Sequence, residues 1–493
     1  MECVLGGWLH RVYAGFLAVY FANLILNFCS LYVAYSPAVL RDTVGLLVMV
    51  TGSVLLTINA VRAYRKELLI PRCAYYLMGL LALMGVSGAA NGYVGLVENV
   101  KIVVWSAILF FVVLPFFQSE DKRSIFRDFT IIVLPGLILW GFMVLVSLVT
   151  FYLNVQECEL WVQDYLRPRF VGVHNNRLFG VFVDASMGSI LCWCMTVVSL
   201  VLAVRTRSKF ARVLLSLLMF CAIQVISASG ARSSVVVIII SSTAFVWLVV
   251  RRRMTGRMKK WGCFDLLILA LSFVGCLLLT LICVQLVREA MVAIARCLNA
   301  DSAGLKLMSL FSVEGSSDGV SVADGSTGSI SLERTDLKGK DVTNLRADLW
   351  AGAFQAFLDK PLFGTSLGGF IPYMREVYPS SFAALGYDVG NGYLAVLVYG
   401  GIFAAIVMAF FIASQLIFFA KWLKGRQQEE DPGLGECALF SLLVSVGVSA
   451  GINMDIFYIN CATTFLFWFV LGALRALCSN VEVHQGCEGG LKQ

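Results

Sequence analysis

The sequence is poor in charged residues. Asp, Glu, Lys and Arg make up only 14% of its 493 residues, whereas 59% are hydrophobic and the mean hydropathy is +0.83. A soluble domain of this composition would leave too much apolar surface in water. We therefore expect an all-α integral membrane protein.

The sequence also lacks the spacings that mark metal and cofactor sites. It has 15 cysteines but no CxxC pair and no Cys/His pattern typical of zinc, so we expect neither a metal site nor another cofactor. Most cysteines lie in apolar runs and are interpreted as small hydrophobic side chains. Cys158 and Cys297 fall in two loops that are expected on the same side of the membrane, and the sequence leaves open whether they pair.

Two further absences concern partners and targeting. The net charge of +7 requires no nucleic-acid partner, because the basic residues cluster in short loops between apolar runs, as membrane topology demands. The first apolar run has no convincing small-residue cleavage site. We expect it to be a membrane span that also serves as an internal signal.

The apolar runs predict about 12 membrane-spanning helices, because a span needs about 20 predominantly apolar residues. The loops after the even-numbered runs are basic, as in "RTRSK" (205–209) and "RRRMTGRMKK" (251–260). By the positive-inside rule, both termini are cytoplasmic and the protein is expected to be multi-pass in the plasma (inner) membrane. The runs lie at roughly 13–34, 42–61, 73–91, 101–117, 129–153, 184–204, 211–228, 232–250, 264–287, 391–420, 434–452 and 454–475.

Two long segments face outward in this topology, and the one before the tenth span is beyond usual loop lengths. Its glycine-, serine- and aspartate-rich middle, 313–340, is expected to be a mobile flap or an extended cover, with a disordered insertion as the alternative. After it, helical spacing of apolar residues over 343–361 predicts a helix at the outer interface that ends before Pro361. The expected parts are 1–153 with five helices, 154–287 with the first outer loop and helices six to nine, 288–390 as the large extracytoplasmic loop with short interfacial helices, and 391–493 with helices ten to twelve and a cytoplasmic tail.

Arginines on the outward side are informative because the positive-inside rule disfavours them there. Arg177 lies in "NNRLFGVF", Arg232 in the short hairpin "SASGARSS", and Arg346 one helical turn before Trp350. Guanidinium groups are permanently charged planar forks that match phosphate oxygens. Together these three arginines are predicted to hold a pyrophosphate at the outer leaflet. Arg296 and Arg334 also lie on the outward side. Four further outward arginines are interpreted as snorkelling or solvated interface residues, namely Arg167, Arg169, Arg288 and Arg375.

Two residues near these arginines are candidates for acid–base chemistry. His174 titrates near neutral pH and could shuttle a proton, although a lone loop histidine is often merely exposed. Asp388 lies three residues before the tenth span and is placed to act as a base or to orient an acceptor hydroxyl.

Other candidates would contact substrate. Asn175 and Asn176 either form a turn or bind sugar hydroxyls. The glycine-rich "PLFGTSLGGF", with Gly364, could offer backbone N–H groups to an anion, and Asn391 is either a helix N-cap or a substrate contact. The aromatic residues of the outer loops that could stack against sugar rings, with interface anchoring as the alternative, are Trp161, Tyr165, Tyr373 and Tyr378. Trp350 is a further candidate for substrate binding.

Four motifs in order carry a family resemblance. They are "RLFGVF" before one span, "SGARSS" between two spans, "LRADLWAGAFQAFLDKPLFGTSLGGF" in the large outer loop, and "GNGYLAVLVYGGI" at the tenth span. The chain thereby resembles the bacterial O-antigen ligase and O-antigen polymerase superfamily over roughly residues 170–405. Each motif is loose by itself, and the order makes the likeness specific.

The resemblance implies a metal-independent, inverting glycosyltransferase that acts at the outer face of the plasma membrane. Its donor would be an undecaprenyl-diphosphate-linked glycan and its acceptor a glycan or a lipid. The counterparts of the diphosphate-binding arginines would be Arg177, Arg232 and Arg346. An acceptor hydroxyl would attack the anomeric carbon, and positive charge would stabilise the departing lipid diphosphate.

The chain departs from the ligase pattern at two positions. Gly390 stands where ligases usually have a histidine, the proposed base, so that Asp388 or His174 replaces it or the reaction proceeds with little general-base help. This favours a polymerase, or a ligase with another acceptor, over a lipopolysaccharide ligase. Asp184 stands where the family often has asparagine.

Other functions stay open at this point. A transporter or flippase of lipid-linked glycan suits twelve spans, but transporters usually need ionisable groups near mid-membrane, and these spans have very few. A peptidoglycan polymerase with Asp336 or Asp341 as its acid, and a purely structural scaffold, are further alternatives. The sequence determines neither the sugar nor the acceptor nor the oligomeric state.

Overall fold

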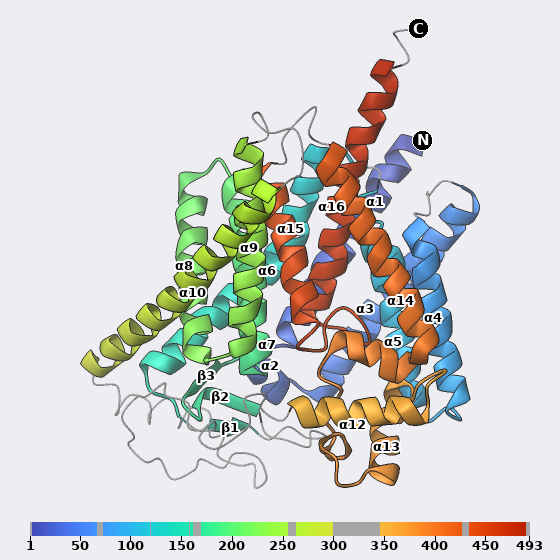
Figure 1. Cartoon of the computed structure of the whole chain (residues 1–493), viewed down its shortest axis with the longest axis horizontal. Helices are drawn as coiled ribbons and strands as arrows, with labels where there is room; N and C mark the ends of the chain where they lie inside the picture. Colours follow the sequence, from blue (N-terminus) through green and yellow to red (C-terminus); the bar gives the residue numbers. More distant parts are fainter. Residues whose placement is uncertain are drawn as a thin grey trace.

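The protein is an all-α polytopic membrane protein, as the composition predicted. A computed structural model describes residues 2–66, 72–118, 120–156, 158–160, 169–254, 263–298, 346–425 and 433–489. The predicted cover 313–340 lies outside the described residues. Long helices run side by side, with a small sheet and two short helices across one end (Figure 1).

Most helices follow the predicted runs closely. The first predicted run, 13–34, is wrong as a single span, because the chain leaves the helical conformation at residues 27–29, between α1 (Glu2–Leu26) and α2 (Ser30–Tyr35). α10 continues to Cys297, about ten residues past its predicted end, and tilts away from the bundle (Figure 1). In chain order the helices are α1 (Glu2–Leu26), α2 (Ser30–Tyr35), α3 (Ala38–Tyr64), α4 (Arg72–Ala90), α5 (Leu96–Ile108) with its π-helical continuation η1 (Leu109–Val113), α6 (Lys122–Tyr152), α7 (Ala185–Arg205), α8 (Lys209–Ser229), α9 (Arg232–Met254), α10 (Cys263–Cys297), α12 (Arg346–Asp359), α13 (Leu367–Val377), the 3-10 helix η2 (Phe382–Leu385), α14 (Gly392–Gly425), α15 (Leu434–Ser449) and α16 (Ala462–Gly489).

The number of spans stays a prediction. Among the described residues, 10 helices are long and apolar enough to cross a membrane. Shorter apolar helices, Leu434–Ser449 and Ala462–Cys478, occupy the places of the last two predicted runs. The predicted boundary between those two runs is wrong, because a connection from residue 450 to 461 separates α15 from α16. The division of the chain into four parts is likewise still a prediction.

α16 lies at the centre of the bundle (Figure 1). Trp468 is fully buried, with its ring 4.6 Å from that of Phe110 in η1, and Phe465 stacks on Phe21 of α1 at 5.0 Å. Such aromatic pairs add stabilisation beyond the apolar area that they bury. The packing therefore joins the first, middle and last helices in one core.

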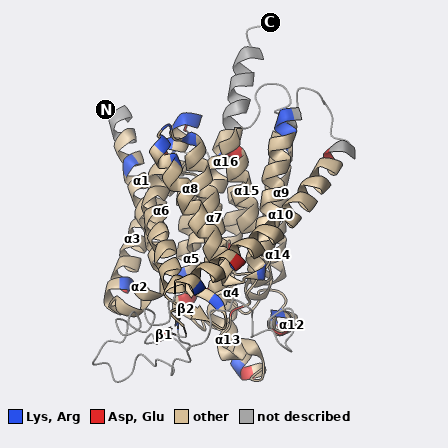
Figure 2. Cartoon of the chain, turned by 90° about the vertical axis from the view of Figure 1, so that its left-hand side faces the viewer, with Lys and Arg blue, Asp and Glu red and all other residues tan. Residues whose placement is uncertain are grey.

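The two ends of the bundle differ in charge. Lys and Arg occupy the tips of α1, α8 and α9 at the end to which both termini project (Figure 2). We call this the basic end. The opposite end, which we call the loop end, carries the strands, α12 and α13 (Figure 1). This polarity agrees with the predicted orientation, and the side of the membrane that each end faces stays a prediction.

The opening motif of the first outer loop forms a small sheet at the loop end. Its three antiparallel strands are β1 (Cys158–Leu160), β2 (Arg169–His174) and β3 (Arg177–Gly180), in the order β1-β2-β3. Asn175 and Asn176 have φ of 50° and 56° between the paired residues His174 and Arg177. Two left-handed residues form the hairpin turn that matches strand twist, so the turn interpretation of the asparagines is correct.

α14 is broken close to the loop end. Gly401 has φ 73° and ψ −171°, which interrupts the helix and leaves carbonyl groups without helical partners. The chain from Pro361 to Ser366 supplies those partners: Thr365 N donates to Val398 O at 2.9 Å and Ser366 N to Tyr399 O at 3.0 Å. Inside a membrane protein such groups need partners within the protein, so loop and break form one unit.

Gly364 is tightly confined in this unit. Its φ is +67°, and an added Cβ would lie 2.4 Å from Val398 O. We expect Gly364→Ala to lower the free energy of unfolding by about 2–4 kcal/mol, from left-handed strain and overpacking. The midpoint of thermal unfolding in detergent measures this. Gly275→Ala is the matched control, because nothing lies within 4 Å of its added Cβ, and equal midpoints for the two variants would contradict the expectation.

Candidate functional site

Arg177 joins the β-hairpin to two helices, α7 and α8. Its Nε donates to Ser229 O, the last residue of α8, at 3.0 Å, and its Nη2 donates to Ser186 Oγ in the first turn of α7 at 3.1 Å. The guanidinium also lies 5.7 Å from the ring of Phe179. The arginine is therefore held at the junction of β3, α7 and the hairpin between α8 and α9.

Arg232 begins α9 just after that hairpin. Gly230 has φ 60°, which permits the tight turn between α8 and α9. Ser229 anchors the turn, since its Oγ accepts from Ala231 N at 3.3 Å and bonds to Ser189 of α7 at 2.6 Å. Arg232 is exposed and lies three residues along the chain from the carbonyl that binds Arg177.

Arg346 is the third of the predicted arginines and lies in the large loop before α14. It begins α12, and its Nη2 donates to Asn453 Oδ1 at 3.1 Å. Burial lowers the pKa of Arg346 from its ordinary value, and the charge of Asp184 opposes that shift. Asp184 caps α7 by accepting from Ser186 N and Met187 N. The cap residue of α7 is thus close to Arg346 and two residues from a ligand of Arg177.

The connection between α15 and α16 supports both Arg346 and the start of α14. Asn391 caps α14 by accepting from Tyr393 N and Leu394 N, and its Nδ2 donates to Gly451 O at 2.8 Å. The N-cap interpretation of Asn391 is therefore correct, while a direct substrate contact stays a prediction. Ile456 in this connection has φ 77°, a strained conformation for a β-branched residue, and such strain clusters at functional sites.

Asp455 is a buried carboxylate that the sequence interpretation missed. It is 2% exposed and accepts hydrogen bonds from Ser449 Oγ and Thr463 Oγ1. Ser449 also accepts from Asn453 Nδ2 at 3.3 Å, which connects Asp455 to the amide that binds Arg346. In the described part of the chain no Lys or Arg forms an ion pair with Asp455. An acid within an apolar run was the available signal.

The two candidate bases differ in surroundings. Asp388 is exposed, and its Oδ1 accepts from Gly390 N at 3.0 Å. Gly390 has φ +62°, and a Cβ there would lie 3.3 Å from Leu349, one turn after Arg346 in α12. His174 instead stacks on Phe170 at 3.8 Å and meets Phe179 edge-on. Asp388 is the candidate with access to water beside α12.

The glycine-rich segment has its amides engaged inside the protein. Gly364 N donates to Lys360 O at 3.0 Å, Gly368 N to Asn99 Oδ1 at 2.9 Å and Gly369 N to Ser366 Oγ at 3.1 Å. The amides of residues 365 and 366 bind α14. The interpretation of this segment as an anion cradle receives no support, and Gly364 has a packing role instead.

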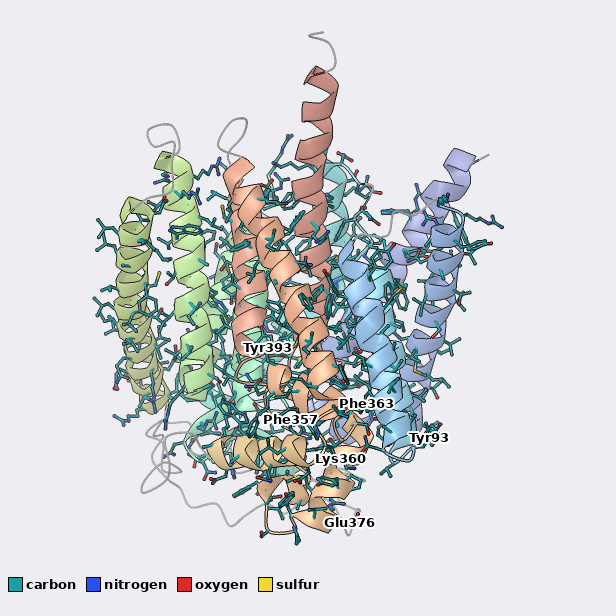
Figure 3. All side chains as sticks on the ribbon, turned by 45° about the vertical axis from the view of Figure 1, so that its right-hand side comes forward. Tyr93, Phe357, Lys360, Phe363, Glu376 and Tyr393 are labelled. Carbon is teal, nitrogen blue, oxygen red and sulfur yellow. The ribbon has the colours of Figure 1, made fainter. Side chains whose placement is uncertain are left out.

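Tyr373 lies at the far end of α12 from Arg346. Its hydroxyl and that of Tyr378 donate to Asp359 at 2.8 and 2.7 Å, and these bonds hold the pKa of Asp359 below its ordinary value. α12 rises about 1.5 Å per residue, so Asp359 is about 20 Å from Arg346. Figure 3 shows Lys360 beside this end of α12 and Tyr393 deeper in the bundle. A sugar contact by Tyr373 stays a prediction, and it would involve a part of the glycan that is remote from the arginines.

Trp350 is one turn from Arg346, and its predicted substrate contact also stays a prediction.

Two further features of the described residues concern the cysteines expected to pair and the side chains that could hold a metal ion. Cys158 and Cys297 are both free, so the disulfide left open by the sequence is not formed. The groups that could hold a metal ion are His10, Glu120 and Asp128, at the basic end. Each imidazole nitrogen faces its own carboxylate, at 3.5 and 2.6 Å, and Arg127 also pairs with Asp128 at 2.9 Å. This is the geometry of an ion-pair network between α1 and α6.

Residues 214–409 match the family model of the O-antigen ligases. The resemblance to the O-antigen ligase and polymerase superfamily is confirmed. The O-antigen ligase match begins in α8 and ends in α14, and it includes Arg232, Arg346, Asp388 and Asn391. Arg177 and its hairpin precede the matched residues, and the hydrogen bond from Arg177 to Ser229 O attaches the hairpin to them. A comparison with curated proteins gives no match.

The two roles of Asp184, cap and negative charge, can be separated. Asp184→Ala removes the acceptor for two backbone amides, so we expect a loss of about 1 kcal/mol in the free energy of unfolding. Asp184→Asn keeps the cap and should stay within about 0.5 kcal/mol of the unmodified protein. Thermal unfolding of both variants in detergent measures the difference. A large loss in Asp184→Asn would mean that the charge opposite Arg346, rather than the cap, is what stabilises the fold.

Proposed function

We propose that the protein is a metal-independent, inverting glycosyltransferase that takes glycan from undecaprenyl diphosphate at the outer face of the plasma membrane. The family match supports a membrane enzyme that processes lipid-linked glycan. The observation that carries the finer proposal is the convergence of arginine-bearing segments on the first turn of α7. Arg177 binds Ser186 there. Arg346 binds Asn453, which is connected through Ser449 to Asp455. Asp455 lines the same small cavity as Met187 of that turn.

The arginines would act on the leaving group. When the acceptor hydroxyl oxygen forms its bond to the anomeric carbon, the bond from that carbon to the phosphate oxygen breaks, and the lipid diphosphate leaves with the electron pair. Preorganised cations stabilise charge that develops on this oxygen. Arg177 and Arg346 donate hydrogen bonds to a carbonyl, a hydroxyl and an amide, which are uncharged groups that orient the guanidinium groups.

Asp388 is the proposed acceptor of the hydroxyl proton. Its exposure and its proximity to the first turns of α12 support this role, and its hydrogen bond from Gly390 N fixes one carboxylate oxygen. Gly390 has φ +62°, a conformation that favours glycine over other residues. The backbone at this position is therefore consistent with glycine in place of the histidine that ligases usually have there. His174, between two aromatic rings, is less accessible.

The structure weakens the case for a flippase. A broken helix such as α14 is typical of transporters, whose breaks expose backbone groups to a substrate cavity. Here the carbonyls of Val398 and Tyr399 are bound by residues 365 and 366, so protein fills the break.

Loss of Arg346 should abolish most transfer. With protein in nanodiscs and undecaprenyl-diphosphate oligosaccharide as donor, we expect Arg346→Ala to lower the rate about 100- to 1,000-fold. Product lengths are measured by gel and mass spectrometry, with and without chelator. A ladder indicates a polymerase and one discrete adduct a ligase, and chelator should change neither.

The matched control is Arg375→Ala, an exposed arginine on α13 whose Nε donates to Ala384 O. It should keep nearly full activity. Equal losses in the two variants, or loss of product on chelation, would contradict the proposal. Transport of the donor across the bilayer without transfer would establish the flippase.

Removal of the proposed base should slow turnover with little effect on donor binding. We expect Asp388→Asn to lower kcat about 100-fold or more while the KM for donor stays similar, because general-base help contributes mainly in the transition state. Asp359→Asn, which removes an exposed carboxylate at the other end of α12, is the control. Full turnover in Asp388→Asn would exclude this aspartate as the base.

A further inference from the structure

An apolar groove lies between α9 and α10 near the basic end. Ile240, Ala244 and Trp247 line it from α9, and Leu266, Leu269 and Phe273 line it from α10. Leu266 is 68% exposed and Phe273 43% exposed, so the α10 wall is open to the surroundings of the bundle. We call this the α9–α10 groove.

The distance from Arg251 to the far end of the groove corresponds to one leaflet. Along α9, Arg251 lies 11 residues beyond Ile240, which is about 16 Å at 1.5 Å per residue. The hydrocarbon core of a bilayer is about 30 Å thick, so one leaflet contributes about 15 Å. A single acyl chain that enters at the basic end would therefore reach the far end of the groove.

Charged groups stand at the mouth of the groove. Arg251 lies one turn beyond Trp247, with its guanidinium 5.5 Å from that ring, and Arg252 and Arg253 follow at the tip of α9. Asp265, beside Leu266 at the start of α10, pairs weakly with Arg251 at 4.0 Å. Figure 2 shows this basic tip of α9. Three arginines against one carboxylate leave the mouth positively charged.

We propose that the α9–α10 groove is a binding site for an anionic phospholipid of the leaflet at the basic end. One acyl chain lies along the groove, and the phosphate binds Arg251 and Arg252. Arginine forks match phosphate oxygens, and the apolar walls match the chain. The site is separate from the arginines at the loop end and does not depend on the proposed transferase function.

Lipid retention by the full chain tests the proposal. Protein in detergent micelles is mixed with equal amounts of dioleoylphosphatidylglycerol and dioleoylphosphatidylcholine, and retained lipids are counted by native mass spectrometry. The unmodified protein should retain the anionic lipid preferentially. Combining Arg251→Gln with Arg252→Gln should lower that preference about 30-fold, since each arginine near anionic lipid contributes about fivefold. Lys209→Gln, at the start of α8 at the same end, is the charge control and should leave the preference unchanged.

Two further variants test the groove without removing arginines. Ala270→Trp places a large ring on the groove wall and should reduce retained lipid to background, whereas Leu279→Trp, at an exposed position elsewhere on α10, should not. Asp265→Asn removes the competing carboxylate and should increase retention of the anionic lipid. Equal retention of both lipids by the unmodified protein, or full retention by Ala270→Trp, would overturn the proposal. Glycan transfer is not part of the readout, so failure here leaves the transferase proposal untouched.

Discussion

Backbone amides and carbonyls inside a membrane need hydrogen-bond partners within the protein, because hydrocarbon offers none. The break at Gly401 satisfies this need through the segment from Pro361 to Ser366, which lies across α14 and binds its free carbonyls. Asn91 and Asn99 hold the same segment from the α4 and α5 side. Hydrogen bonds to the free carbonyls of the broken helix thus attach this part of the large loop to the bundle. α12 directly precedes the attached segment in the chain.

The candidate site also depends on the need of buried backbone groups for hydrogen-bond partners within the protein. The connection from 450 to 461 is buried, and it binds the start of α14 through Gly392 N, at 2.7 Å from Ala450 O. Asn453 of this connection then serves two purposes. Asn453 contributes a backbone acceptor to α14 and a side-chain acceptor to Arg346. The arginine that begins α12 is thereby fixed by a segment more than a hundred residues away.

Charge is distributed in two ways along the bundle. At the basic end arginines gather near the predicted cytoplasmic leaflet, and Asp265 balances part of their charge beside the α9–α10 groove. At the loop end the charge of Asp184 acts on Arg346, and Asp184 caps α7 at the same time. The first arrangement favours an anionic lipid, whereas the second leaves guanidinium groups oriented largely by neutral acceptors.

The sequence by itself determined the membrane class, the positions of most helices, the α12 helix and the family, because each depends on a local run of residues or on motif order. Asn391 as a cap and Asn175–Asn176 as a turn were also within its reach. Only the tertiary structure decided the sheet order, the break in α14, the engagement of the Gly364 amide and the distance of Tyr373 from Arg346. Asp455 and Asn453 entered the site for the same reason. Asp455 bonds to Ser449 and Thr463, which are near it in the chain, but Asn453 binds Arg346 more than a hundred residues away. Local sequence carries no information on which distant groups packing brings within hydrogen-bond distance.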